Sequence, residues 1–266
     1  MGNNKKIEKI LEIDARSTVD KIKNFIQNKV KEAGSRGAVL GLSGGLDSST
    51  AAFLCSKALK DRDVLAISMP EKGITDPQNV EDSERIAKDL GIKFQKIEIS
   101  PIFEKIKEEI GSGEEKKNAD GNLKARIRMI ILYYHSNLFD YLVVGTSNKS
   151  ELKCGYFTKY GDGAADLLPL GALYKTQVRK IAKEIGVPQD IIDKTPSAEL
   201  WRGQKDSQEL GLTYDKIDKI YAGLEAELSE KEIVEAVNVP LSTAREFNLR
   251  KKNSKHKLQS PPTPAL

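Results

Sequence analysis

A glycine-rich loop between an apolar run and a helical pattern carries the strongest chemical signal in the sequence. The run 38–42 predicts a buried strand, and Ser43-Gly44-Gly45 interrupts it before Asp47 opens a pattern of helical period. Two adjacent glycines let backbone N–H groups turn inward, and the dipole of the following helix directs its positive end to the same place. The spacing is neither G-x-x-x-x-G-K-[ST] nor G-x-G-x-x-G. The pattern therefore predicts a phosphate-chain site of another kind; the alternative is a simple turn capped by serine.

Alternating strands and helices must position this loop. The expected strands cover 38–42, 63–69, 93–99 and 141–145, and the expected helices cover 17–33, 47–59, 76–90, 123–138, 178–185, 214–228 and 229–236. Such an alternation predicts an α/β fold with a doubly wound parallel sheet and helices on both faces. Ligands of these sheets bind beyond the carboxyl ends of the strands, so the polar stretch 146–151 should face the same crevice as the loop.

The whole-chain properties limit the classes of function. The 266 residues suit a single domain over 1–266, with a polar, mobile loop near 111–120 and a basic tail over 250–266 that composition alone assigns to disorder. Lys plus Arg number 43 against 39 Asp plus Glu, which gives no nucleic-acid signature. No apolar run approaches the roughly 20 residues of a membrane span, so we expect a cytoplasmic protein without a membrane partner. Cys55 and Cys154 are expected to be reduced thiols.

Several motifs together resemble one known family. The loop S-G-G-L-D-S resembles the pyrophosphate loop of ATP pyrophosphatases that release AMP. The further segments that resemble NAD synthetase are G-N-L-K-A-R-I-R-M-I (121–130), V-V-G-T-S-N-K-S-E (143–151), G-Y-F-T-K-Y-G-D-G-A-A-D-L-L-P-L (155–170), L-Y-K-T-Q-V (173–178) and K-T-P-S-A-E-L (194–200). The resemblance covers nearly the whole chain and implies a Rossmann-like fold of the adenine nucleotide alpha hydrolase type.

The resemblance also implies a reaction. ATP adenylates the carboxylate of deamido-NAD (nicotinic acid adenine dinucleotide), pyrophosphate leaves, and ammonia attacks the acyl-adenylate to give NAD and AMP. It further implies Mg²⁺ as cofactor and a homodimer with the dinucleotide near the interface. Only about 37 residues precede the first expected strand, so we expect free ammonia rather than glutamine as the nitrogen source.

Site residues follow from the resemblance position by position. The implied ATP-binding residues are Gly41, Leu42, Ser43, Gly44, Gly45, Leu46, Asp47, Ser48, Thr146, Lys175 and Ser197, the last where threonine is commoner. The implied deamido-NAD-binding residues are Arg126, Lys159, Asp166, His256 and Lys257. Asp47 and Glu151 are the implied metal ligands, because carboxylates suit Mg²⁺ bound jointly with phosphate oxygens. With Lys175 they form the implied catalytic set.

Simpler interpretations stay open at the level of the sequence. Asp47 alone could be a helix cap, Glu151 a solvated loop residue, and the lysines and arginines surface side chains with buried stems. Phe157 either stacks on a ring of the ligand or packs. At the level of function, a tRNA thiolase needs a catalytic cysteine, whereas Cys55 falls on an apolar helix face. A ligase resembling GMP synthetase shares the loop but not the stretch 155–170, and a non-enzymatic nucleotide-binding module shares the sheet but does not need Asp47, Glu151 and the segment around Asp166 together.

Overall fold

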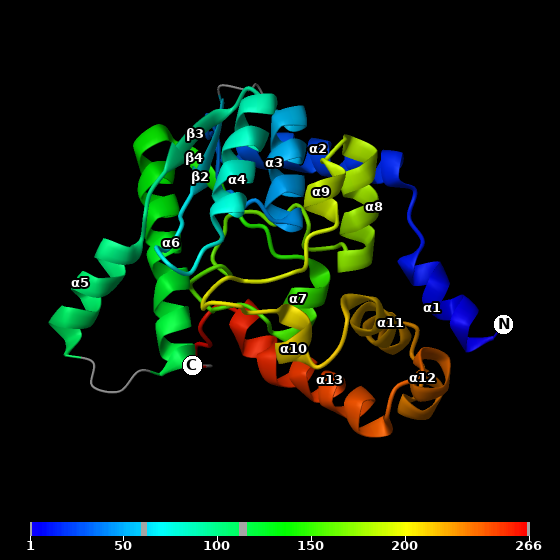
Figure 1. The fold of residues 1–266 in the computed structure, drawn as a ribbon. Helices are drawn as coiled ribbons and strands as arrows, with labels where there is room; N and C mark the ends of the chain where they lie inside the picture. Colours follow the sequence, from blue (N-terminus) through cyan, green and yellow to red (C-terminus); the bar gives the residue numbers. More distant parts are fainter. Residues whose placement is uncertain (1, 60–62, 112–115, 265–266) are drawn as a thin grey trace.

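A four-stranded parallel sheet forms the centre of the molecule (Figure 1). The computed structural model describes residues 2–59, 63–111 and 116–264. The strands are β1 (Gly37–Gly41), β2 (Val64–Ser68), β3 (Lys93–Lys96) and β4 (Tyr141–Val144), in the spatial order β3-β2-β1-β4. The first strand pairs on both sides, and the order reverses next to it. The loop that follows β1 therefore lies at a switch point of a doubly wound sheet, and the predicted fold class is confirmed.

Helices cover both faces of the sheet and lie beyond its carboxyl edge (Figure 1). In chain order they are α1 (Asn3–Leu11), α2 (Ala15–Glu32), α3 (Leu46–Ala58), α4 (Pro77–Asp89), α5 (Ser100–Ile110), α6 (Lys117–Phe139), α7 (Lys149–Cys154), α8 (Lys175–Ile185), α9 (Gln189–Ile192), α10 (Asp206–Leu210), α11 (Tyr214–Glu225), α12 (Glu230–Val237), α13 (Leu241–Ser254) and the 3-10 turn η2 (Lys255–Leu258). None of the described helices is long and apolar enough to cross a membrane.

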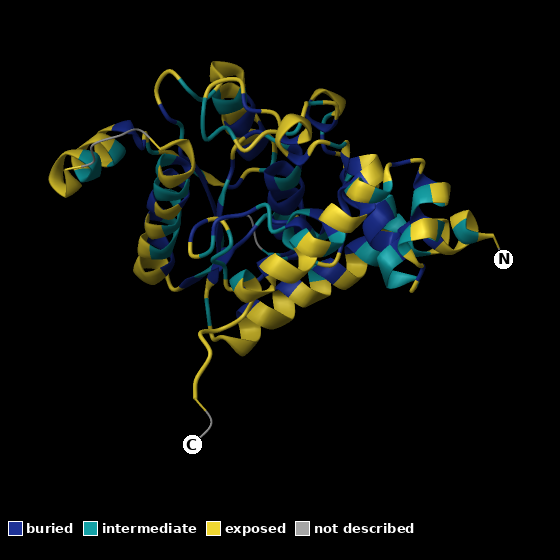
Figure 2. Ribbon diagram, turned by 90° about the horizontal axis from the view of Figure 1, so that it is seen from below, coloured by how far each residue is buried: buried dark blue, intermediate teal, exposed yellow. Residues whose placement is uncertain are grey.

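Alternate residues of β1 point into two separate cores. Leu40 packs with α2, α3 and α8 on one face, whereas Val39 packs with Ile127 and Ile131 of α6 on the other. Almost every side of α3 is buried, because it lies between the sheet and other helices. Figure 2 shows buried residues concentrated at the centre and exposed residues on the outer faces of peripheral helices. The loop before α3 is thus held by the best-packed part of the protein.

A third core joins the two ends of the chain. Ile7 and Leu11 of α1 pack against α11 and α12, together with Phe247 of α13 and Tyr221 of α11. This helical layer supports α7 and α8, whose first residues lie near the carboxyl edge of the sheet. It therefore positions side chains at that edge without contributing strands.

The structure differs from the sequence prediction in several elements. The helix expected from residue 123 begins at Lys117, within the stretch expected to be a mobile loop; residues 112–115 of that stretch lie outside the described residues. The third strand ends at Lys96, although Ile97 and Ile99 still donate backbone hydrogen bonds to Ser68 and Pro70. Helices α5, α7, α9, α10 and α13 were not predicted; α5, for example, buries only Ser100.

The basic tail is also more regular than its composition suggests. Helix α13 runs to Ser254, and η2 continues to Leu258. Ser254 is buried and packs against Gly155, where an added Cβ would lie 2.2 Å from the Ser254 Cβ. This part of the tail docks on the segment that follows α7.

Candidate active site

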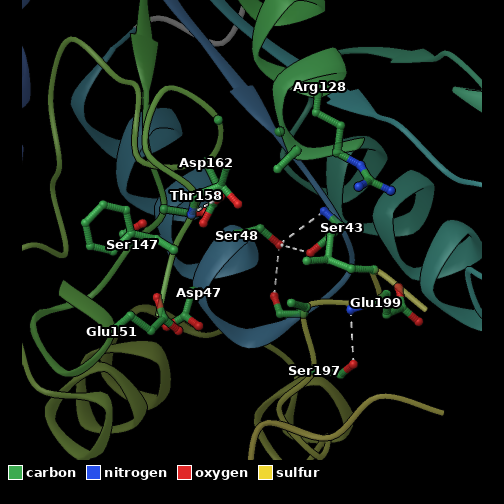
Figure 3. Close-up of a pocket in the computed structure, with 18 of the residues that line it drawn as sticks. Ser43, Asp47, Ser48, Arg128, Ser147, Glu151, Thr158, Asp162, Ser197 and Glu199 are labelled. Atoms are coloured by element: carbon green, nitrogen blue, oxygen red, sulfur yellow. Dashed lines mark hydrogen bonds between the residues drawn. The ribbon is translucent and has the colours of Figure 1, made fainter. Parts of the chain in front are cut away.

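A cleft of about 700 Å³ opens at the carboxyl edge of the sheet. Its floor is formed by the ends of β1, β2 and β4, and its walls come from α3, α6, α7, α10 and the segment 194–204. Figure 3 shows the side chains of Ser43, Asp47, Glu151 and Arg128 around this cleft. Residues from separate parts of the chain therefore meet where the topology predicts a ligand.

The loop between β1 and α3 exposes unpaired backbone donors to the cleft. Gly44 has φ +74°, and an added Cβ would lie 2.3 Å from the backbone oxygen of Asn79, so only glycine fits there without a shift. Ser48 closes the loop, because its hydroxyl accepts the Ser43 N–H at 3.2 Å. Within the described part of the chain, the N–H groups of Gly45 and Leu46 have no acceptor. A loop of free amides at a helix N-terminus is suited to an anion such as a phosphate chain.

The carboxyl groups of Asp47 and Glu151 both contact the ammonium of one lysine, Lys175. The Lys175 ammonium forms an ion pair with Asp47 and lies 3.5 Å from the Glu151 carboxylate. Asn148 connects the two acids, since its side-chain amide donates to Asp47 at 3.2 Å and its side-chain oxygen accepts the Glu151 N–H at 3.1 Å. Figure 3 shows the Asp47 and Glu151 carboxylates next to each other.

The local structure explains why these three side chains converge. Gly45, rather than Asp47, is the N-cap of α3, so the Asp47 carboxylate is free to turn toward the cleft. Glu151 is the third residue of a capping box at the start of α7, and its carboxylate also accepts the Asn148 N–H at 3.2 Å. Lys175 is the first residue of α8, where its N–H donates to Ser150 at 2.9 Å. The solvated-loop interpretation of Glu151 is therefore wrong.

Burial shapes the charges of this cluster. Burial and the neighbouring Asp47 raise the pKa of Glu151 to about 8, although Lys175 opposes them. Burial also acts to lower the pKa of Lys175, but Asp47 and Glu151 outweigh it and raise that pKa. The ammonium therefore stays protonated at neutral pH between the two acids.

The donor set fits Mg²⁺. Asp47 and Glu151 both contact the Lys175 ammonium, so a cation is stabilised at this point, and the proton that the raised pKa keeps on Glu151 would be released when a metal binds. The described residues contain no larger group of acids, histidines or cysteines placed to hold a metal ion. A metal bound by Asp47 and Glu151 would therefore take its other oxygens from phosphate and water, as Mg²⁺ commonly does.

A second group of polar side chains lies beside this cluster, where the Lys175 ammonium is 5.0 Å from the centre of the Tyr214 ring. Buried Asp206 of α10 accepts the Tyr214 hydroxyl at 2.9 Å and the Tyr156 hydroxyl at 3.3 Å, and burial raises its pKa. Tyr156 also donates to Glu209 at 2.6 Å. Asp162 lines the cleft as well and accepts the Thr158 N–H at 2.9 Å. The aromatic ring of Tyr156 is thus fixed at the cleft by two carboxylates, whereas Phe157 is buried beside it.

The implied ATP-binding residues outside the loop also reach the cleft. Thr146 follows β4 and lines the cleft next to Ser147. Ser197 lies on the opposite side, where its hydroxyl accepts the Glu199 N–H at 3.1 Å and the side chain is exposed. The structure therefore brings together the loop, Thr146, Lys175 and Ser197, although their contacts with a nucleotide stay a prediction.

Of the five implied dinucleotide-binding residues, all of which the structure describes, Lys257 alone lines this cleft, whereas Arg126, Lys159, Asp166 and His256 do not. Arg126 is exposed and donates to the Lys159 carbonyl at 3.3 Å. Asp166 lies in a separate hollow near Tyr133 and Asp140, where it accepts the Val143 N–H at 2.7 Å and the Tyr133 hydroxyl at 3.2 Å. Arg126 and Asp166 are on the surface of the single chain rather than in one pocket, so a shared ligand would have to extend beyond the cleft.

The tail reaches the same region from the other end of the chain. The Lys257 ammonium donates to the carbonyls of Gly155 at 2.8 Å and Phe157 at 3.0 Å, and it lines the cleft. Lys159 donates to the His256 carbonyl at 3.0 Å, while the His256 side chain is exposed. The tail therefore fixes the segment 155–159, in addition to any contact with a ligand.

Sequence reasoning does not identify several residues of the cleft. Asn148, Asp162, Lys194 and Asp206 all line or support it, yet their residue types and spacing alone do not mark them. Asp206 lies in the stretch G-Q-K-D-S-Q-E-L-G at 203–211, whose polar composition resembles a solvated turn. The only available signal is their position inside segments that already resemble one family.

The arrangement can bind a phosphate chain on the loop amides and hold a divalent cation beside it. Protonated Lys175 and the N-terminus of α3 then face the same phosphate chain. These features suit transfer of a nucleotidyl group with departure of pyrophosphate, because charge on the leaving group is stabilised from several directions.

Comparisons with known proteins agree with this geometry. Residues 18–261 match the profile of a family described as NAD synthase. The NH(3)-dependent NAD(+) synthetase of Methanocaldococcus jannaschii is 49% identical over 255 residues, which cover 93% of this chain and 96% of that protein. A solved structure of an NMN synthetase from Francisella tularensis superposes with a TM-score of 0.85 at 33% identity, covering 96% of this chain and all of that one. An NH3-dependent NAD synthetase from Campylobacter jejuni, in complex with the nitrate ion, gives a TM-score of 0.80 at 34% identity, with the same coverage.

Proposed function

Because the chain belongs to the NAD synthase family, we propose that it is a C–N-bond-forming ligase that converts deamido-NAD to NAD with ATP and free ammonia. The nicotinate carboxylate attacks the α-phosphorus of ATP, and pyrophosphate leaves. Ammonia then attacks the carbonyl carbon of the acyl-adenylate, AMP leaves with one oxygen of the original carboxylate, and a proton is lost from the nitrogen. Pairing of Asp47 and Glu151 on one ammonium beside the loop of free amides is the observation that carries this proposal.

The residues of this chain perform distinct parts of the reaction. The Gly45 and Leu46 amides hold the phosphate chain, with the N-terminus of α3 behind them. Lys175 remains protonated and stabilises the charge that grows on the departing pyrophosphate. Asp47 and Glu151 would hold Mg²⁺, which when bound neutralises phosphate charge. Tyr156, fixed by Asp206 and Glu209, offers a ring face on which the nicotinate can stack.

Ammonia is the proposed nitrogen source. The chain covers 96% of the M. jannaschii relative, which is described as NH(3)-dependent. Free Cys55 and Cys154 are both buried, and burial raises both pKa values to about 12, so neither serves as the nucleophile that a glutaminase or a thiolase requires. These reduced thiols also fit the cytoplasm, where we propose that the enzyme acts.

A homodimer is the proposed assembly, and α6 offers a surface for it. Exposed apolar side chains gather on the outer side of this helix: Ile130, Tyr134, Leu138 and Phe139. Arg126 belongs to the same helix, and Asp166 contacts it through Tyr133. A partner subunit on this face would cover the apolar side chains and bring the remaining implied dinucleotide-binding residues toward an interface.

The test is product formation from defined substrates. The protein is incubated with ATP, Mg²⁺, ammonium and deamido-NAD, and NAD is separated by chromatography. Glutamine in place of ammonium should be nearly inert. Deamido-NMN, the mononucleotide analogue, is the matched comparison substrate because one similar structure is that of an NMN synthetase. If NMN forms and NAD does not, the substrate is deamido-NMN rather than deamido-NAD. If neither amide forms, the proposal is refuted.

A further inference from the structure

Lys194 lines the cleft, yet its ammonium has no donor left for a ligand. Its three N–H groups reach the Gly44 carbonyl at 2.9 Å, the Asn79 side-chain oxygen at 2.5 Å and the Asp82 carboxylate at 2.5 Å. A lysine beside a phosphate loop would ordinarily be taken for a phosphate ligand. Here all three acceptors belong to the protein, so the geometry indicates a different role.

The anchor of this lysine is a buried carboxylate. Asp82 of α4 is 3% exposed, and its other oxygen accepts from Arg85 at 2.8 Å. Burial acts to raise the pKa of Asp82, but hydrogen bonds from Lys194 and Arg85 outweigh it and hold the pKa below its ordinary value. The Asp82 carboxyl is therefore ionised at neutral pH, and α4 presents a fixed carboxylate behind the loop.

Holding the Gly44 carbonyl also orients the next amide. In a trans peptide the C=O of Gly44 and the N–H of Gly45 point in opposite directions. Lys194 draws the carbonyl toward α4, which directs the Gly45 N–H away from α4. That N–H is one of the unpaired loop donors among the described residues, and Gly44 keeps its positive φ against the backbone of Asn79. The lysine thus fixes the one peptide unit of the loop that glycine leaves most free to turn.

The same contacts join the loop to the segment that carries Ser197. Lys194 begins this segment, and Glu199 near its end accepts the Asn79 side-chain amide at 2.8 Å and the Asp76 N–H at 3.2 Å. Figure 1 shows α4 beside α3. Both ends of the segment are therefore fastened to the first turns of α4, which also contacts the loop.

We propose that Lys194 is a positioning residue that sets the phosphate loop for ATP through Asp82, and that it is not itself a phosphate ligand. The inference rests on the proposed function in taking ATP as the ligand of the loop. It predicts that the Asp82–Lys194 pair strengthens binding of the ATP phosphate chain and does not change binding of deamido-NAD.

Three variants separate positioning from direct contact. Lys194→Met removes the ammonium and keeps the length of the side chain, while Asp82 retains Arg85. Asp82→Asn removes the charge that holds Lys194 in place. Arg85→Gln is the matched control, because it removes the other cation from Asp82 without touching the loop. Calorimetry measures the Kd of α,β-methylene-ATP with Mg²⁺, and steady-state assays measure KM for ATP and for deamido-NAD.

A positioning role predicts that both Lys194→Met and Asp82→Asn weaken the analogue, the former by roughly tenfold or more. The double variant should be no weaker than Lys194→Met beyond about a factor of two, because the two residues act as one unit. Arg85→Gln should stay within about twofold of wild type, and KM for deamido-NAD should not change beyond about twofold in any folded variant.

Two results with the variants would overturn the positioning role of Lys194. If Asp82→Asn binds the analogue as well as wild type or more tightly, the freed lysine contacts phosphate directly and the proposal is overturned; this comparison holds even if Lys194→Met does not fold. A wild-type Kd in Lys194→Met overturns it as well. Absence of NAD formation by wild type would defeat the proposed function alone, since the analogue still reports on the loop. Failure of wild type to bind the analogue would overturn the positioning proposal, whereas the NAD assay alone decides the proposed function.

Discussion

Replacing Gly44 with alanine should damage the phosphate loop, whereas the same change at Gly45 should leave the folded protein intact. At Gly44 the added Cβ would lie 2.3 Å from the Asn79 oxygen, so the loop or α4 has to move, and φ is +74°. At Gly45 the nearest atom, the Ser43 hydroxyl oxygen, is 3.5 Å away and φ is −90°. The two neighbours therefore form a matched pair.

The expected cost for Gly44→Ala comes from two sources. A left-handed alanine costs about 1 kcal/mol, and relief of a backbone overlap in a packed site costs about 1–3 kcal/mol. A total of roughly 2–4 kcal/mol corresponds to a roughly 30- to 1,000-fold loss if all of it appears in ATP binding. If it appears in the free energy of unfolding instead, Tm should fall by about 5–15 °C.

Thermal denaturation and calorimetry with α,β-methylene-ATP measure the two contributions. Gly45→Ala should keep the wild-type Tm, and any loss of analogue binding in that variant would report close approach of a phosphate to Gly45. A Gly44→Ala protein with wild-type Tm and wild-type Kd would refute the argument from loop geometry.

Three further predictions address the metal ligands, the tail and the thiols. Asp47→Ala or Glu151→Ala should lower the rate of NAD formation by about 100-fold or more with the circular dichroism spectrum unchanged, because charge stabilisation at pyrophosphate is lost; a near-normal rate would contradict the metal assignment. Truncation after Asn253 should raise KM for deamido-NAD about tenfold and leave KM for ATP nearly unchanged, because the tail fastens the segment 155–159; equal weakening of both would indicate general destabilisation. Iodoacetamide at pH 8 should spare both cysteines until urea is added, since a pKa of about 12 leaves roughly one thiolate in 10⁴; rapid alkylation of the native protein would show an accessible thiol.

The sequence predicts the sheet well because local and long-range signals agree there. The apolar runs of β1, β2 and β4 are buried, and the loop glycines mark the end of β1. The helix start at Asp76-Pro77 is confirmed, as Asp76 caps α4 and accepts the Gln78 N–H at 2.9 Å. Each of these signals is contained within a few neighbouring residues, which is why sequence alone suffices.

The site is less predictable because its contacts join distant segments. Nothing in the local sequence indicates that Lys175 lies between Asp47 and Glu151, or that Lys194 is committed to α4 rather than to a ligand. The polar start of α6 at Lys117 escapes prediction for a similar reason. Its first turns are stabilised by contacts such as that between Gly121 and Leu200, which no period in the sequence reveals.

Transfer of oxygen from the nicotinate carboxylate to AMP tests the central claim most directly. Deamido-NAD labelled with ¹⁸O in both carboxylate oxygens is turned over with ATP, Mg²⁺ and ammonium, and the products are read by phosphorus NMR and mass spectrometry. Adenylation on the loop between β1 and α3 predicts one ¹⁸O in the phosphate of AMP, one in the amide of NAD, and none in pyrophosphate. Label in inorganic phosphate with formation of ADP would mean that the terminal phosphoryl group is transferred instead, and would contradict adenylation.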